Sequence, residues 1–152
     1  MINKFSKLKS ITESEIIEKY LKKLNFDKRE SFGFKNDSAY LNSFKNKKTI
    51  VTNDSIIENV DFFKNDSAQS IAHKIVTSNL SDLSAMGAKP YCYTLNLCMP
   101  KYITIDWLES FSYYLIKLQK KYNLNKNKIP KVDIILEYNA DRILEKNILD
   151  II

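Results

Sequence analysis

Apolar residues recur along the chain with a helical period in some stretches and a period of two in others. The helical period predicts three helices: residues 13–24, residues 69–86, and a stretch opened by Asp106 and Glu109, which resemble a capping box. Thr12 and Glu15 form a capping box before the first helix. Ser67 or Asp66 is the candidate cap of the second helix, and Gly87 is its expected stop.

The period of two predicts the strands. It is clearest over residues 91–99, where Pro100 ends the pattern. The other candidate strands are residues 38–44, residues 48–53 after a lysine-rich turn, and residues 132–136. Residues 141–152 have apolar positions that predict a short amphipathic helix. Helices and strands in this order indicate an α+β fold in which the helices pack on a sheet.

Composition narrows the possible functions. A chain of 152 residues, 44% of them hydrophobic, predicts a single domain or one domain with a tail. Its two glycines are too few for a P-loop or a dinucleotide-binding fingerprint. The net charge is +6, and almost all of the positive charges are lysines, because only Arg29 and Arg142 are arginine. Nucleic-acid surfaces favour arginine, so we expect no nucleic-acid partner.

The cysteines and the hydropathy pattern indicate a reducing compartment. Cys92 and Cys98 lie in one predicted strand, about 20 Å apart at a rise of about 3.3 Å per residue, which is too far for a disulfide. The single histidine, His73, falls on a polar helix face, which argues against a zinc site with these thiols. No signal peptide or membrane-length apolar run is found. We therefore expect a cytoplasmic protein with no membrane partner.

Acidic residues in unusual places are the candidate chemistry. Asn79 and Asp82 fall on the apolar face of the second helix, where a carboxylate must be paired, hydrogen-bonded or metal-bound. Asp54 is expected to end the strand of residues 48–53, and Asp37 to begin the strand before it. Three aspartates without a histidine or thiolate partner suit a hard ion such as Mg²⁺, and such sites usually serve phosphate chemistry. Caps and turns are the alternative explanation for each of them.

Residues 79–90 read Asn-Leu-Ser-Asp-Leu-Ser-Ala-Met-Gly-Ala-Lys-Pro. This run resembles the Asn-Leu-Ser-Asp-Leu-Ala-Ala-Met-Gly-Ala-x-Pro motif of the thiamine-monophosphate kinase family, which belongs with aminoimidazole ribonucleotide synthetase. Residues 51–62 and 33–39 resemble the family's Thr-Thr-Asp-x-Leu-Val-Glu-Gly-Val-His-Phe and Gly-Ile-Gly-Asp-Asp-Ala-Ala segments. The resemblance implies the N-terminal domain fold of that superfamily, a mixed or antiparallel sheet with helices packed on one face.

The resemblance also implies a function and a site. It implies ATP- and Mg²⁺-dependent phosphorylation of thiamine monophosphate by a cytoplasmic phosphotransferase that forms a homodimer through this domain. Asp37, Asp54 and Asp82 would be the Mg²⁺ ligands. Asn79 would support Asp82 or touch the nucleotide, and Ser55 and Glu58 would face the substrate. No residue is assigned with certainty as catalytic.

The sequence departs from the family pattern at several points. Asn36, Lys35, Asn59 and Asp61 replace an aspartate, two glycines and a histidine of the family segments. No Gly-Gly-Asp-Thr segment follows residue 124, and the second domain of the family is missing from the 152 residues. We therefore expect a kinase-like domain over residues 1–124 and a divergent tail over 125–152. The alternatives to an active kinase are a non-catalytic remnant, a dimerisation or regulatory module, or one half of a split kinase.

Overall fold

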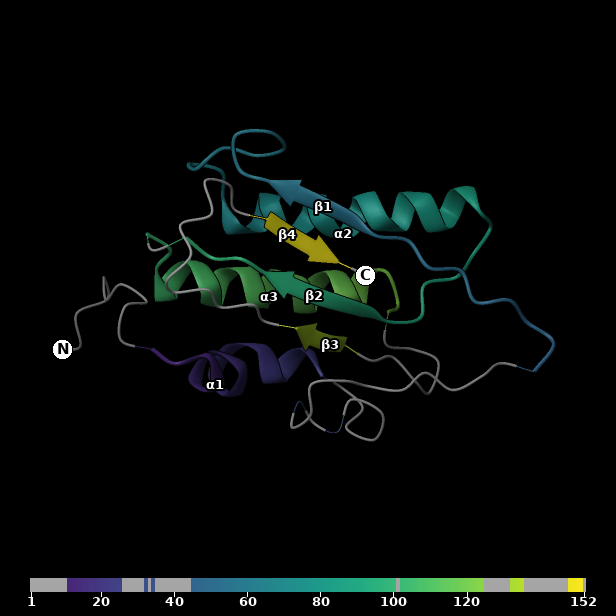
Figure 1. Ribbon diagram of the computed structural model, residues 1–152, viewed down its shortest axis with the longest axis horizontal. Helices are drawn as coiled ribbons and strands as arrows, with labels where there is room; N and C mark the ends of the chain where they lie inside the picture. The colour runs from purple at the N-terminus through teal and green to yellow at the C-terminus, as the bar shows by residue number, and fades with distance from the viewer. Residues whose placement is uncertain are drawn as a thin grey trace.

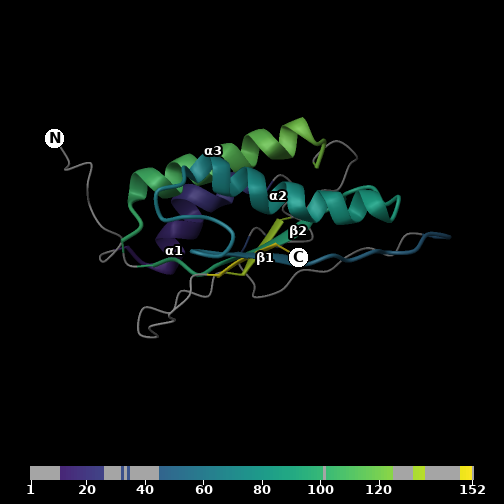
Figure 2. The ribbon, with the colours of Figure 1, turned by 90° about the horizontal axis from the view of Figure 1, so that it is seen from above.

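The computed structural model describes residues 11–25, 32, 34, 45–100, 102–124, 132–135 and 148–151. The predicted strand of residues 38–44 and the aspartate Asp37 lie outside these residues. Figure 1 labels the elements and colours them by their position in the sequence, and Figure 2 shows how they are layered.

The first predicted helix is continuous but changes its winding. It consists of α1 (Glu13–Ile16), a π-helical turn η2 (Ile17–Leu21) and a 3₁₀ turn η3 (Lys22–Leu24). Its start is the predicted capping box: the Thr12 hydroxyl accepts from the Glu15 amide at 3.3 Å, and the Glu15 carboxylate accepts from the Thr12 amide at 2.9 Å. The two long helices are α2 (Ala68–Ala85) and α3 (Ile105–Lys121).

The caps of the long helices explain their limits. Ser67 caps α2, its hydroxyl accepting from the Ser70 amide, and Gly87 ends it with a φ of +64°, which glycine adopts without strain. The prediction that Asp106 opens the third helix was wrong: Thr104 is the N-cap, and its hydroxyl accepts from the Trp107 amide at 3.2 Å. Asp106 instead lies in the first turn, where an acidic side chain stabilises the helix dipole.

The sheet has four strands in the order β1-β4-β2-β3. These are β1 (Asp54–Ile57), β2 (Tyr93–Leu97), β3 (Val132–Ile135) and β4 (Ile148–Ile151). β4 is antiparallel to both β1 and β2, whereas β2 and β3 are parallel. The strand predicted over residues 91–99 is confirmed as the shorter β2, with every second residue buried, and the strand predicted over 132–136 is confirmed as β3.

Two strand-related predictions were wrong. A strand was predicted over residues 48–53, but the observed strand β1 begins only at Asp54. Pairing with β4 starts there, where Asp54 is opposite Ile151. Residues 47–53 carry no strand, and Val51 is 69% exposed. Residues 148–151, expected to be helical, form the strand β4 between β1 and β2. Residues 141–147 lie outside the described part of the chain, and the boundary predicted at residue 124 stays a prediction.

All the helices lie on one side of the sheet (Figure 2), so the expected α+β fold with a mixed sheet and helices on one face is confirmed. The core lies between the two layers. Its buried apolar side chains come from α1, α2, α3, β1 and β2, and include Ile16, Ile56, Ile75, Leu95, Leu97 and Phe111. None of the helices in the described ranges is both long and apolar enough to span a bilayer.

Candidate functional site

Strand β1 places the predicted site residues at its two ends and on both of its faces. Ile56 is 2% exposed and packs into the core, and Asp54 and Glu58 share its face because strand side chains alternate. Ser55 is exposed on the opposite face. About 13 Å of strand separates Asp54 from Glu58 at about 3.3 Å per residue. The structure therefore divides the predicted site into two regions.

The first region is where Asp54 meets the C-terminal half of α2. The Asn79 side chain is 6% exposed, and its Oδ1 accepts from the Asp54 amide at 3.1 Å. Its Nδ2 donates to the carbonyls of Ile75, at 3.0 Å, and Asp54, at 3.5 Å. These bonds fasten the start of β1 to the helix. Asn79 thus supports the backbone of Asp54, whereas the family resemblance had implied that it supports Asp82 or touches the nucleotide.

Asp82 lies one turn further along α2 and is exposed. Its Oδ2 accepts from the Thr52 hydroxyl at 3.0 Å, which links the helix to the segment before β1. The expectation of a carboxylate inside an apolar face was wrong. The end of α2 extends beyond the sheet (Figure 2), so Leu83 is only half-buried and Met86 is 67% exposed. The apolar residues recur with helical spacing there, but no core packs against them.

The donor set of this region fits Mg²⁺ in part. Asp54 and Asp82 supply carboxylate oxygens, and Mg²⁺ in nucleotide sites is typically bound by one or two carboxylates together with phosphate oxygens and water. Within the described residues, no three His, Cys, Asp or Glu side chains are grouped closely enough to hold a metal without such help. The third predicted ligand, Asp37, lies outside the described residues.

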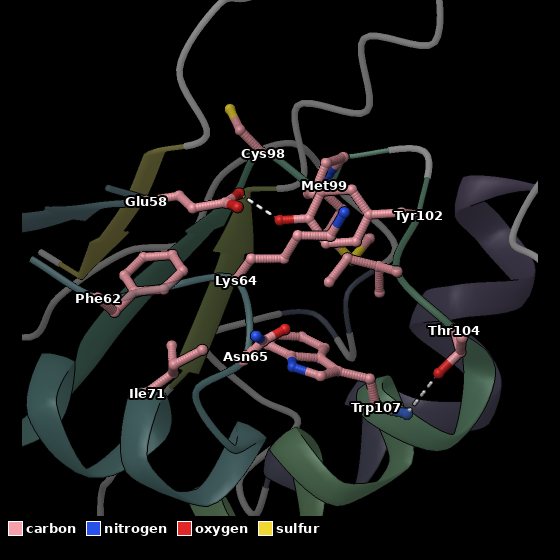
Figure 3. Close-up of a pocket in the computed structure, with 12 residues that line it drawn as sticks. Glu58, Phe62, Lys64, Asn65, Ile71, Cys98, Met99, Tyr102, Thr104 and Trp107 are labelled. Atoms are coloured by element: carbon pink, nitrogen blue, oxygen red, sulfur yellow. Dashed lines mark hydrogen bonds between the residues drawn. The ribbon is translucent and has the colours of Figure 1, made fainter. Parts of the chain in front are cut away.

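The second region is a pocket of about 190 Å³ at the other end of β1. Figure 3 shows its walls converging from the end of β1, the loop after it, the first turn of α2, the end of β2 and the start of α3. The walls are mostly apolar and aromatic. The residues that line it include Phe62, Ile71, Met99, Tyr102, Ile103 and Trp107, with Glu58, Lys64, Asn65 and Thr104 as polar members.

Glu58 and Tyr102 form the polar centre of the pocket. Glu58 is 7% exposed, and its Oε2 accepts the hydroxyl hydrogen of Tyr102 (Figure 3). Burial, and then the hydrogen bond to Glu58 and its negative charge, raise the pKa of Tyr102, so that the phenol stays neutral. The Lys64 ammonium lies 4.4 Å from the centre of the Tyr102 ring, within cation–π range.

The loop after β1 is held by its own polar side chains. The Asp61 carboxylate accepts a hydrogen bond from the Ile57 amide at 2.9 Å. The backbone carbonyl of Asp61 accepts one from the Lys74 ammonium. Asn59, which stands where the resembling family segment has glycine, has a φ of +64°. Asparagine tolerates this left-handed conformation better than most residues, so this departure from the family pattern preserves the turn.

Sequence reasoning found Glu58 but missed Tyr102, Lys64 and Trp107. Tyr102 follows Pro100 in a short connection and has no periodic pattern around it. It reaches Glu58 across 44 positions of sequence, a contact that only the fold brings about. The one available signal was local: the apolar pattern already placed Trp107 in the first turns of the third predicted helix, although the Thr104 cap was not expected.

A family model agrees with this picture. Residues 35–125 match the model described as AIR synthase related protein, N-terminal domain. The chain belongs to this family. The match includes both regions described above and all of α2 and α3.

Curated relatives confirm the expected resemblance to thiamine-monophosphate kinases. The thiamine-monophosphate kinase of Buchnera aphidicola subsp. Schizaphis graminum is 42% identical over 114 residues, which cover 74% of this AIR synthase related chain and 35% of the relative. The Haemophilus influenzae thiamine-monophosphate kinase is 30% identical over 138 residues, covering 89% and 42%. The chain thus spans less than half the length of the curated relatives it matches.

Solved structures of thiamine-monophosphate kinases share the fold. The enzyme of Stenotrophomonas maltophilia K279a aligns with a TM-score of 0.59 at 28% identity, over 77% of this chain and 33% of its own. AaThiL complexed with AMPPCP and TMP aligns with a TM-score of 0.57 at 21% identity, over 96% of this chain and 42% of its own. The second likeness supports the fold alone.

Proposed function

We propose that this chain provides the N-terminal part of a thiamine-monophosphate kinase, which transfers a phosphoryl group from ATP to thiamine monophosphate. The observation that carries the proposal is the junction of β1 and α2. There the Asn79 amide fixes the backbone of Asp54, and Asp82 is held by Thr52 but remains exposed. Two aspartates at one junction, one of them exposed, suit Mg²⁺ bound to nucleotide phosphates.

In this proposal the residues have separate roles. Asp54, Asp82 and Asp37 hold Mg²⁺, and Asn79 positions Asp54. Ser55 and Glu58 face the substrates from the two faces of β1. When bound, Mg²⁺ neutralises charge on the phosphate oxygens during transfer. The protein contributes positioning, which is the main requirement of phosphoryl transfer.

The assembly is part of the proposal. Residues 1–124 would form the kinase-like domain, whose sheet is completed by β3 and β4 from the residues that follow. A second copy would pair with it to give a homodimer in the cytoplasm, where ATP is available. β2 lies inside the sheet between β4 and β3, so its edges are already paired. We place the pairing surface at residues 91–99, which would therefore use the face of the sheet away from the helices, including Thr94 and Asn96.

Calorimetric titration of Mg²⁺·ATP tests the metal site. We expect saturable, Mg²⁺-dependent binding to the 152-residue protein and about tenfold or greater weakening in Asp82→Asn, because a charged ligand becomes neutral while the shape is kept. Asp106→Asn, an exposed aspartate on α3, is the matched control and should bind as the parent does. Equal binding by Asp82→Asn, or no binding by the parent, would overturn the proposal.

Catalysis needs a second measurement. The 152 residues contain no Gly-Gly-Asp-Thr segment, so we expect no thiamine diphosphate to form when the purified chain is given ATP, Mg²⁺ and thiamine monophosphate. Product formation by this chain alone would contradict that expectation and show that the site is complete.

A further inference from the structure

We propose that the outer face of α3 is a self-complementary surface on which a second copy of this chain docks, with the two α3 helices antiparallel about Tyr113. α3 lies on the side of the helical layer away from the sheet (Figure 2). The surface is therefore separate from the sheet face proposed above for pairing, and the inference does not rest on the kinase function.

The exposed residues of α3 form one stripe along the helix. They are Asp106, Glu109, Ser110, Tyr113, Lys117, Lys120 and Lys121. At 3.6 residues per turn they cover about a third of the helix circumference. The opposite side holds the fully buried Leu108, Phe111 and Leu115, so the stripe faces solvent.

The charges on this stripe are segregated about Tyr113. Asp106 and Glu109 lie seven and four residues before it, and Lys117 and Lys120 lie four and seven residues after it. When two such helices lie antiparallel about Tyr113, Glu109 of each copy is opposite Lys117 of the other. Asp106 is opposite Lys120 in the same way. One patch thus matches itself, as an interface with two-fold symmetry requires.

Within one copy these charges have no opposite partner. Segregation places Asp106 near Glu109, and Lys117 near both Lys120 and Lys121, at spacings of three or four residues. Like charges at these spacings destabilise a helix slightly. Among the residues that the structure describes, no salt bridge includes any of the five. A second copy would give the charges at both ends of the stripe a partner.

The acidic end of the stripe extends to the first helix. Burial, and then the negative charges of Glu109, Glu15 and Asp106, raise the pKa of Tyr20. Three carboxylates therefore lie near one tyrosine, where α3 begins. The lysines of a second copy would reduce this concentration of negative charge.

The helix dipole explains only part of the charge order. It favours Asp106 in the first turn and Lys120 in the last. It does not explain Tyr113, whose side chain is 54% exposed at the middle of the stripe. Tyr114 contacts the Tyr113 ring edge-on, and the Lys117 ammonium lies 4.6 Å from its centre. An exposed aromatic ring held in place between charged groups is typical of the centre of an interface with a polar rim.

Sedimentation velocity of the 152-residue protein measures the association. One pair of helices is a small contact between exposed charges, so we expect weak self-association that increases with concentration up to about 1 mM. It should weaken severalfold between about 50 mM and 500 mM salt, because salt screens exposed charges. If the domains also pair through the sheet, the α3 contact should join those pairs into larger assemblies.

Charge reversal on the two sides of Tyr113 tests the alignment. Glu109→Lys and Lys117→Glu each create two like-charged contacts in the antiparallel pair, so each variant alone should associate about tenfold more weakly or less. An equimolar mixture of the two variants restores both contacts with the signs exchanged, and it should associate as the parent does. Lys89→Glu, at an exposed position outside α3, has the same charge change as Lys117→Glu and should leave association unchanged.

Cross-linking tests the two-fold axis. Tyr113→Cys chains should form a disulfide between copies under mild oxidation, because this position faces itself in the pair. Lys89→Cys chains are the matched control, since both variants retain Cys92 and Cys98, and they should cross-link much less. Melting curves confirm that each variant is folded at the assay temperature.

Several results would overturn the proposal. These are no salt-sensitive association of the parent, an unweakened single variant, a mixture that does not associate, or equal cross-linking of the two cysteine variants. Weakening by Lys117→Glu but not by Glu109→Lys would mean that the lysines bind a different acidic surface, and it would reject the antiparallel pair. None of these measurements depends on Mg²⁺ or nucleotide, so failure of this proposal is distinguishable from failure of the kinase assignment.

Discussion

At one end of β1, Glu58 is 7% exposed among aromatic side chains, whereas at the other end Asp82 is exposed to solvent beside the start of the strand. Both carboxylates accept a hydrogen bond from a hydroxyl group, that of Tyr102 or that of Thr52. They differ in what surrounds them. The buried carboxylate is part of the packing, so its removal affects both stability and ligand binding, whereas the exposed one can be changed with little effect on the fold.

Asn79 shows that the open end also has a buried anchor. It is 6% exposed and bonded to the backbone of Asp54, while Asp82, three residues later, is exposed. Neighbouring turns of one helix thus hold a structural amide and an accessible carboxylate. Rigidity of the first is what gives the second a fixed position relative to β1.

The largest expected effect on stability is at the middle of β1, between the two ends. Ile56 is 2% exposed in the middle of β1, and Ile56→Ala should lower the free energy of unfolding by about 2–5 kcal/mol, through lost burial and the cavity left behind. Urea denaturation measures this. Ser55→Ala, on the exposed face of the same strand, is the control and should change stability by less than about 0.5 kcal/mol. Similar losses in both variants would show that β1 does not pack on α2.

The next effect is at the anchor of the open end. Asn79→Ala should cost about 1–3 kcal/mol, because the Asp54 amide loses its acceptor in a part-buried position. Amide hydrogen exchange gives a local readout: exchange at Asp54 should accelerate more than exchange within β2. Ser81→Ala, at an exposed position of the same helix, should leave both quantities unchanged. Unaltered exchange at Asp54 would remove the anchoring role.

The sequence predicts local features of this fold well. The limits of α2 were expected within one residue, because Ser67 caps it and Gly87 supplies the left-handed turn that ends it. The strand at β2 followed from the alternation of apolar residues over residues 91–99, and the structure buries every second residue of β2. Asp54, Asn79 and Asp82 were placed together from a motif, and the structure brings them to one junction, although their roles as ligands stay a prediction.

Features that depend on distant partners could not be predicted. Thr49, Ile50 and Val51 have strand propensity, yet β1 begins only where β4 pairs with it. Residues 148–151 have an apolar pattern that fits a helix or a strand, and their position between β1 and β2 decides for the strand. The exposure of Asp82 depends on α2 extending beyond the sheet, which no helical period reveals.

A smaller effect distinguishes the pocket end by its response to pH. Tyr102→Phe should cost about 0.5–1.5 kcal/mol at neutral pH, because Glu58 loses a donor. The pKa of Tyr102 is raised above 10.0 in the folded protein, so the folded state retains the proton longer than the unfolded state does. Its contribution to stability is fully present below pH 10.0 and is lost as the pH rises toward the folded pKa.

Stability measured as a function of alkaline pH tests this. The parent should lose stability more steeply above pH 10.0 than Tyr102→Phe does. Tyr93, whose pKa is also raised by burial, remains in both proteins and contributes the same slope to each. Tyr113→Phe, at a 54% exposed position on α3, should retain the slope of the parent. Parallel curves for the parent and Tyr102→Phe would mean that Tyr102 ionises equally in both states.

The smallest expected effect on the fold is at Asp82. Asp82→Asn should change the free energy of unfolding by less than about 0.5 kcal/mol, because the side chain is exposed and the asparagine Oδ1 can still accept from the Thr52 hydroxyl. The same variant is expected to weaken Mg²⁺·ATP binding about tenfold. Thermal melting in the absence of ligand, compared with Asn79→Ala, measures the difference between the two residues. A loss of stability from Asp82→Asn as large as that from Asn79→Ala would show that the carboxylate is a structural acceptor. Its assignment as a metal ligand would then be rejected.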